Sequence, residues 1–127
     1  MTDIPHQEWP VILRSEFDPE FDELPSGVQN GLLSALRLLG EYCPQLGRPH
    51  VERLAGSRYA NMKELRVRHR REPWRFLFAL DTDRGAVVLT GGNKAADARF
   101  YERRIAIADG RFERHLAARK KREKPKR

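Results

Sequence analysis

The 127-residue sequence predicts an α/β fold, more narrowly an α+β fold, in which a small antiparallel or mixed β-sheet is joined by two N-terminal helices and one C-terminal helix. Apolar residues recur at helical spacing over residues 26–42 and again from Asp97 onwards. Between these segments, residues 61–69 and 74–81 alternate apolar and polar positions across a short charged turn, which is typical of paired strands. The predicted order of elements is β-α-α-β-β-β-α.

The N-terminal third is predicted to contain one strand and two helices. Residues 9–17 are rich in strand formers, with a proline near the start, as an edge strand allows. The acidic segment Asp18-Pro19-Glu20 favours the positive end of a helix. Ser26, followed by Gln29, forms a capping-box pattern, so a second helix is expected from Ser26 to about residue 42.

The remainder of the chain is predicted to form a loop, three strands and a long helix. Residues 44–58 are expected to be a connecting loop, because proline and glycine are frequent there. An antiparallel meander should follow, at roughly residues 61–69, 74–81 and 86–91. The last helix is expected to open near Asp97 and to bury one stripe, formed by Tyr101, Ile105, Ala108, Phe112 and Leu116.

Charge is distributed unevenly along the chain. The whole sequence has 25 Lys and Arg against 18 Asp and Glu, a net charge of +7. Residues 1–47 have a net charge of −6, whereas residues 48–71 have +6 and residues 111–127 have +7. A basic central segment beside an acidic one indicates a local anion site, and nucleic acid is the acidic partner that such a site suggests.

The length predicts one domain, residues 1–118, followed by a basic and disordered tail at residues 119–127. Such a tail would add salt-dependent affinity for RNA. The single cysteine, Cys43, rules out an intramolecular disulfide and suits a reducing compartment. No apolar run approaches the ~20 residues of a membrane span, no signal pattern is seen, and no ligand spacing indicates a metal or cofactor. A cytoplasmic protein without membrane contact is therefore expected.

Several motifs in one order resemble the RelE/ParE superfamily of toxins, in its HigB-like, phage-related branch. The resemblance covers most of residues 9–118. It rests on the segments Leu46–Val51, Asn61–Arg66, Trp74–Ala79, Gly91–Lys94, Phe100-Tyr101 and Ala108–Phe112. The chain departs from the usual pattern at Asn93, where an aspartate is more common, and in its extra basic tail.

The resemblance implies a sheet with helices on one face and a basic concave surface on the other. It also implies the toxin of a type II toxin-antitoxin pair: a ribosome-dependent, metal-independent mRNA endonuclease, neutralised by an antitoxin that contains a helix-turn-helix. Cleavage by attack of the 2′-hydroxyl needs a base, cations around the phosphorane-like transition state, and an acid for the leaving oxygen. A hetero-oligomer of toxin and antitoxin would be expected.

Two alternatives remain open at this point. Relatives of the ParE type share the fold but inhibit DNA gyrase, and a fold does not fix a function. The second alternative is a non-catalytic accessory protein that binds nucleic acid or a partner protein through its basic face.

The candidate catalytic residues are cations on neighbouring predicted strands. Alternation places Arg66 and Arg75 away from the apolar face, where two guanidinium groups can hold one phosphate. Lys94, in the turn after a Gly-Gly-Asn strand end, is a candidate stabiliser or general acid. The alternative is that the two arginines are solvated surface groups paired with Glu64 or Asp81, and that Lys94 is a plain loop lysine. Glu64 is either a general base or the ion-pair partner of Arg66, and the ion pair is favoured.

Further candidates surround this set. His50 has the side chain best suited to proton transfer near neutral pH, and His69 is a second possibility at the end of the strand. The RNA-binding candidates are Lys63, Arg68, Arg48 and Tyr101. Among them, Lys63 alternates onto the apolar side and Tyr101 lies on the helix stripe, where core packing competes with base stacking.

Overall fold

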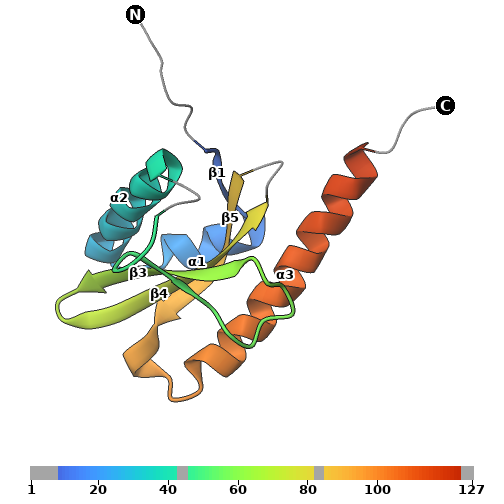
Figure 1. Ribbon diagram of the computed structural model, residues 1–127. Coiled ribbons are helices and arrows are strands. Elements are labelled where there is room, and N and C mark those ends of the chain that lie inside the picture. The colour runs from blue at the N-terminus through green and yellow to red at the C-terminus, as the bar shows by residue number, and fades with distance from the viewer. Residues whose placement is uncertain (1–8, 43–45, 82–84, 124–127) are drawn as a thin grey trace, which may run out of the picture.

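The computed structural model describes residues 9–42, 46–81 and 85–123 (Figure 1). Its centre is a five-stranded mixed sheet with strand order β1-β5-β4-β3-β2. The strands are β1 (Val11–Leu13), β2 (Val51–Arg53), β3 (Met62–His69), β4 (Glu72–Asp81) and β5 (Gly85–Asn93). β1 is parallel to β5, and all other neighbours are antiparallel. The predicted α+β fold and the β3-β4-β5 meander are confirmed, and Cys43 lies outside the described residues.

The helical elements are the 3-10 turns η1 (Ser15–Phe17) and η2 (Lys94–Ala96) and the helices α1 (Asp18–Asp22), α2 (Ser26–Tyr42) and α3 (Phe100–Glu123). Both predicted N-terminal helices are confirmed, and α2 begins at Ser26 as expected. The first strand is shorter than the predicted 9–17, because the chain turns into η1 after Arg14. The last helix begins at Phe100, three residues after Asp97, because residues 98–99 form a turn in which the Asp97 carboxylate accepts a 2.9 Å hydrogen bond from the Arg99 amide.

β2 lies within residues 44–58, which were predicted to be a connecting loop, and this part of the prediction was wrong. It pairs antiparallel with β3, so that Val51 lies opposite Leu65 and Arg53 opposite Lys63. Val51 is buried in the same core as Leu65. The pairing is what makes residues 51–53 a strand, since three residues are too short for a periodicity to be recognised.

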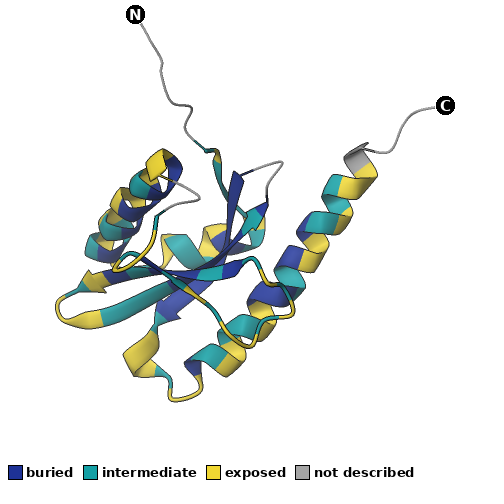
Figure 2. Ribbon diagram, viewed as in Figure 1, coloured by how far each residue is buried: buried dark blue, intermediate teal, exposed yellow. Residues whose placement is uncertain are grey.

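Both faces of the sheet are covered by helices, and the expectation of helices on one face alone was wrong. α2 packs on one face and α3 on the opposite face (Figure 1). The α2 core contains residues such as Leu36, Leu65 and Phe76, whereas the α3 core contains Leu77 and Phe112. Figure 2 shows the resulting burial of the central strands. Strand β5 is apolar at successive positions because both of its faces are buried.

The paired glycines of β5 serve these two layers separately. A β-carbon at Gly91 would lie 2.1 Å from the buried ring of Phe76 on the α2 side. A β-carbon at Gly92 would lie 3.3 Å from Phe100 and 3.2 Å from Arg104 on the α3 side. Gly91 therefore leaves room for the ring of Phe76, and Gly92 leaves room for Phe100 and Arg104.

The predicted disordered tail was wrong for residues 119–123, which continue α3. The Arg119 guanidinium binds the buried carboxylate of Asp81 at the far end of β4. Residues 124–127 lie outside the described part of the chain. The C-terminal basic segment thus begins as an ordered part of the domain rather than beyond it.

Candidate functional site

Arg66 and Arg75 lie directly opposite each other on β3 and β4. Both belong to the sheet face on which α3 packs, as the alternation with Leu65 and Phe76 requires. The Arg66 side chain is 36% exposed, whereas that of Arg75 is only 11% exposed. The predicted arginine pair is therefore present on one face, but one member is nearly buried.

β2 brings His50 to this pair. The residue precedes the strand, and its carbonyl oxygen accepts a 2.8 Å hydrogen bond from the Arg66 amide. A cleft of about 330 Å³ opens here and is lined by Pro49, His50, Arg66, Val67, Arg68 and Arg75. Four of the eight predicted site residues thus meet in one concave region.

A buried carboxylate lies beside the cleft. Glu64 is only 3% exposed, and its Oε2 accepts a 3.1 Å hydrogen bond from Arg66 Nε. The same oxygen lies 3.9 Å from Arg75 Nε. The other oxygen, Oε1, accepts a 2.7 Å hydrogen bond from the Tyr101 hydroxyl. The ion pair with Glu64, which the sequence left as one option for Arg66, is present.

Tyr101 joins the start of α3 to this carboxylate. Burial raises the pKa of its phenol, and the hydrogen bond to Glu64 raises it further. The ring packs at the edge of the α3 core, and the Lys94 ammonium lies 5.3 Å from the ring centroid. Lys94 is exposed in η2, where Asn93 caps the turn by accepting a 2.9 Å hydrogen bond from the Ala95 amide.

The cleft has the chemistry of an anion site. Among the described residues, Arg75 Nε is buried without a hydrogen-bond acceptor, although its Nη1 donates to the Trp74 carbonyl at 3.1 Å. This nitrogen is shielded from solvent and faces the Glu64 carboxylate at 3.9 Å, so Arg75 contributes to the cleft through its positive charge. Arg66 and Arg68 supply two further cationic groups in the same lining. The three guanidinium groups of the lining favour an anion such as a phosphodiester.

The remaining predicted residues lie elsewhere. Arg48 is exposed and forms a 2.8 Å ion pair with Glu52, which raises the pKa of the guanidinium. Lys63 pairs with Phe78 and therefore lies on the α2 face, so the cleft lining does not include it. The idea that His69 reaches the cleft was wrong, because its ring lies against Gly27 of α2. Asp81 binds His115 and Arg119 at the other end of the sheet and is not the arginines' partner.

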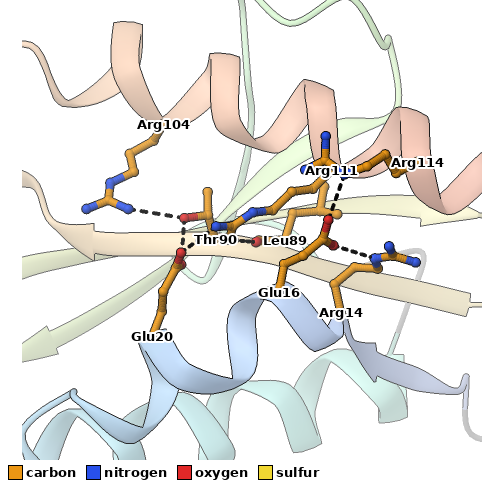
Figure 3. Close-up of polar contacts among 8 residues, drawn as sticks. All are labelled: Arg14, Glu16, Glu20, Leu89, Thr90, Arg104, Arg111 and Arg114. Carbon is orange, nitrogen blue, oxygen red and sulfur yellow. Dashed lines mark hydrogen bonds and ion pairs between the residues drawn. The ribbon is translucent and has the colours of Figure 1, made fainter.

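A second polar cluster, which the sequence analysis did not identify, joins α1, β5 and α3 (Figure 3). Arg111 donates to Glu20 at 2.5 Å and to the Leu89 carbonyl at 2.8 Å. Thr90 donates to the other oxygen of Glu20 at 3.0 Å and accepts from Arg104 at 3.2 Å. The segment Ala108–Phe112 belongs to the motifs that carry the family resemblance, but no role was predicted for its arginine.

Among the described residues, no group of three or more His, Cys, Asp or Glu side chains is arranged to hold a metal ion. In the same part of the chain, no helix combines the length and apolar character that a membrane crossing requires.

The fold is that of a RelE-like protein. A mutant of the E. coli toxin RelE, in the free state, matches with a TM-score of 0.54 over 77% of this chain and 98% of that chain. The identity is 17%, so this likeness concerns the fold.

The chain belongs to the family described as Phage derived protein Gp49-like (DUF891), whose model matches residues 19–113. It is similar to the putative toxin HigB3 of Mycobacterium tuberculosis, with 39% identity over 85% of this chain and 94% of that protein. It is also similar to the putative toxin HigB2 of the same organism, with 43% identity over 68% of this chain. The match spans only 44% of the length of HigB2. The predicted resemblance to the HigB-like branch is confirmed.

Proposed function

We propose that this chain is the toxin of a type II toxin-antitoxin pair and acts as a ribosome-dependent mRNA endonuclease. The observation that carries the proposal is the cationic cleft between β2, β3 and β4, whose lining contains Arg66, Arg68 and Arg75. The relatives named as putative toxins support the toxin assignment.

In the proposed reaction, the ribose 2′-oxygen attacks the adjacent phosphorus while a base removes the hydroxyl proton. The bond between phosphorus and the 5′-oxygen breaks, and an acid protonates that oxygen. The products are a 2′,3′-cyclic phosphate and a 5′-hydroxyl end. Arg66 and Arg75 hold the charged phosphoryl oxygens, because guanidinium groups bind them in a bidentate manner.

His50 and Lys94 are the proposed groups for proton transfer and for additional charge stabilisation. The carbonyl of His50 is fixed on the Arg66 amide, which keeps this residue at the cleft. Lys94 approaches from η2, over the ring of Tyr101. Arg68 contacts a flanking phosphate, and the ring of Tyr101 offers a surface against which a base can stack.

The test is inducible expression of the parent chain beside Arg66→Ala and Lys94→Ala, followed by mapping of cellular mRNA with 5′-hydroxyl ends. Arg53→Ala is the matched control, because Arg53 lies opposite Lys63, on the α2 side of the sheet. We expect new in-frame cuts in the parent and the control that disappear in both site variants. Growth arrest without new ends would contradict the endonuclease proposal, and accumulation of relaxed plasmid would then indicate gyrase inhibition. If neither new mRNA ends nor relaxed plasmid appeared, the chain would instead be a non-catalytic binding protein.

The proposed partner is a cognate antitoxin with a helix-turn-helix, encoded beside this chain. Binding of such a partner to the folded state would raise the apparent stability by mass action. Co-expression with the neighbouring gene should restore growth and yield a co-purifying complex. A neighbour that neither binds nor restores growth would contradict this partner.

A further inference from the structure

The buried carboxylate of Glu64 lies at the centre of the cationic residues that the proposed function uses. One oxygen accepts from Tyr101 at 2.7 Å, and the other accepts from Arg66 at 3.1 Å and lies 3.9 Å from Arg75 Nε. Lys94 does not contact Glu64 itself, but its ammonium lies 5.3 Å from the ring centroid of Tyr101, whose hydroxyl binds Glu64. Each of the three proposed catalytic cations is therefore within two contacts of one carboxylate.

A carboxylate that is 3% exposed would be unfavourable at this position without such partners. Its presence also opposes RNA binding, because a negative charge beside the cleft repels phosphate. Affinity for the anion therefore does not explain its place. Orientation does, since binding through Nε leaves the two terminal nitrogens of Arg66 to point elsewhere.

We propose that Glu64 is a positioning residue, which fixes the side chains of Arg66 and Arg75 from one side and those of Tyr101 and Lys94 from the other. This inference rests on the proposed endonuclease function. The Tyr101 hydroxyl proton is directed at Glu64 and not at the cleft. The phenol thus acts as a support that ties α3 to β3, and its ring face remains the surface that meets Lys94.

A positioning role predicts that loss of the Glu64 charge slows cleavage without weakening RNA binding, whereas a purely structural role does not predict this difference. In Glu64→Gln the shape and an acceptor for Tyr101 are kept, while the negative charge is lost. RNA affinity should then be equal or higher, because a repulsive charge has gone. Cleavage should be slower, because the guanidinium groups are no longer held where charge develops in the transition state.

Glu52→Gln is a matched control. Its carboxylate lies 3.8 Å from Arg66 Nη2, so the substitution removes the same charge beside the same arginine. Glu52 is hydrogen-bonded to Arg48, and among the described residues no contact links it to Arg75 or Tyr101. We expect this variant to bind RNA at least as tightly as the parent and to keep its maximal cleavage rate.

The experiment measures cleavage of a defined mRNA on translating ribosomes across a range of protein concentrations, with the full chain and its variants. The maximal rate of Glu64→Gln should fall on the order of 10²-fold, with an unchanged or lower half-saturating concentration. Tyr101→Phe, which removes the hydroxyl that binds Glu64, should also lower the maximal rate, by about tenfold, because the carboxylate is then less firmly placed. Circular dichroism and thermal melting establish that each variant is folded.

The inference would be overturned if the maximal cleavage rate of Glu64→Gln were within about threefold of the parent's, since a group that positions the catalytic cations should matter more than that. The endonuclease proposal would remain intact. A raised half-saturating concentration with an unchanged maximal rate would also overturn the inference, because that result assigns Glu64 to binding. If Glu64→Gln does not fold, an unchanged maximal rate in Tyr101→Phe overturns the inference instead. A parent chain that cleaves no mRNA would overturn both proposals together, and the two failures are thereby distinguished.

Discussion

Arg111 in α3 donates a 2.5 Å hydrogen bond to Glu20 in α1, so that two residues 91 positions apart join the N-terminal helical turn to the C-terminal helix. The same guanidinium binds the carbonyl of Leu89 in β5. The Arg111 side chain is 15% exposed and that of Glu20 is 31% exposed, so the pair is partly shielded from water. One ion pair thus fixes three elements around the edge of the sheet.

Replacing Glu20 should therefore destabilise the fold. In Glu20→Ala, both Arg111 and Thr90 lose an acceptor, and we expect the free energy of unfolding to fall by about 2 kcal/mol, as for other hydrogen bonds to charged groups. Urea unfolding measures this change. The control is Glu23→Ala at the exposed end of α1, which should change stability by less than about 0.5 kcal/mol. Equal effects from the two substitutions would contradict a role for the pair.

The paired glycines of β5 should differ in their tolerance of a methyl group. Gly91→Ala would press a β-carbon into the buried ring of Phe76, which has no room to move, and should cost about 1–3 kcal/mol of unfolding free energy. Gly92→Ala meets the end of Arg104 at 3.2 Å, and a flexible side chain can shift. Urea unfolding of both variants should show the larger loss for Gly91→Ala. The reverse order would contradict the assignment of Gly91 to the α2 core.

Much of the fold could be predicted from local patterns, because those patterns report local physics. The capping box at Ser26 marked the start of α2, and short charged turns marked the meander. The parallel pairing of β1 with β5 is a contact between distant segments, which no local periodicity encodes. Helices on both faces were missed, although the apolar run of residues 86–89 was a signal of burial on two sides.

The candidate site was predictable in part for the same reason. Alternation placed Arg66 and Arg75 on one face, and their pairing across two strands followed from the hairpin. His50 was a candidate by residue type alone, because its approach to Arg66 depends on β2, a strand of three residues. The central place of Glu64 depends on Tyr101, which comes from α3, 37 positions further along the chain. Contacts of that kind require the tertiary fold.

Arg68 provides a test of the proposed path of the RNA. It is exposed and lines the cleft, so Arg68→Ala should weaken RNA binding uniformly across sequences. Loss of one phosphate contact should reduce the slope of log affinity against log salt by about 0.7 for a single strand. Binding of a short single-stranded RNA over a salt series measures the slope. Arg53→Ala, on the α2 side, is the control and should leave the slope unchanged. Equal slope changes in the two variants would contradict a phosphate contact at Arg68, because they would indicate that the RNA is attracted by the overall positive charge of the protein.

His115 should make stability depend on pH in the mildly acidic range. The side chain is buried, its ring stacks on Phe112, and its Nε2 lies 3.2 Å from an oxygen of Asp81. Burial lowers the pKa of His115, the Asp81 carboxylate opposes that shift, and Arg14 and Arg119 reinforce it. The imidazole is therefore protonated less readily in the folded protein than in the unfolded chain, which binds a proton below a pKa of about 6.5.

It follows that the stabilisation by neutral His115 is fully present above about pH 6.5 and is lost as the pH falls below that value. The lowered pKa of the Glu16 carboxyl acts at more acidic pH, below its ordinary value of 4.5, and does not account for a change in this range. Urea unfolding at pH 7.5 and pH 5.5 should show a loss of unfolding free energy in the parent that is smaller in His115→Gln, because glutamine does not titrate. The prediction would be contradicted if the unfolding free energy of the parent were the same at both pH values. It would also be contradicted if His115→Gln lost as much stability as the parent, because another group would then be responsible.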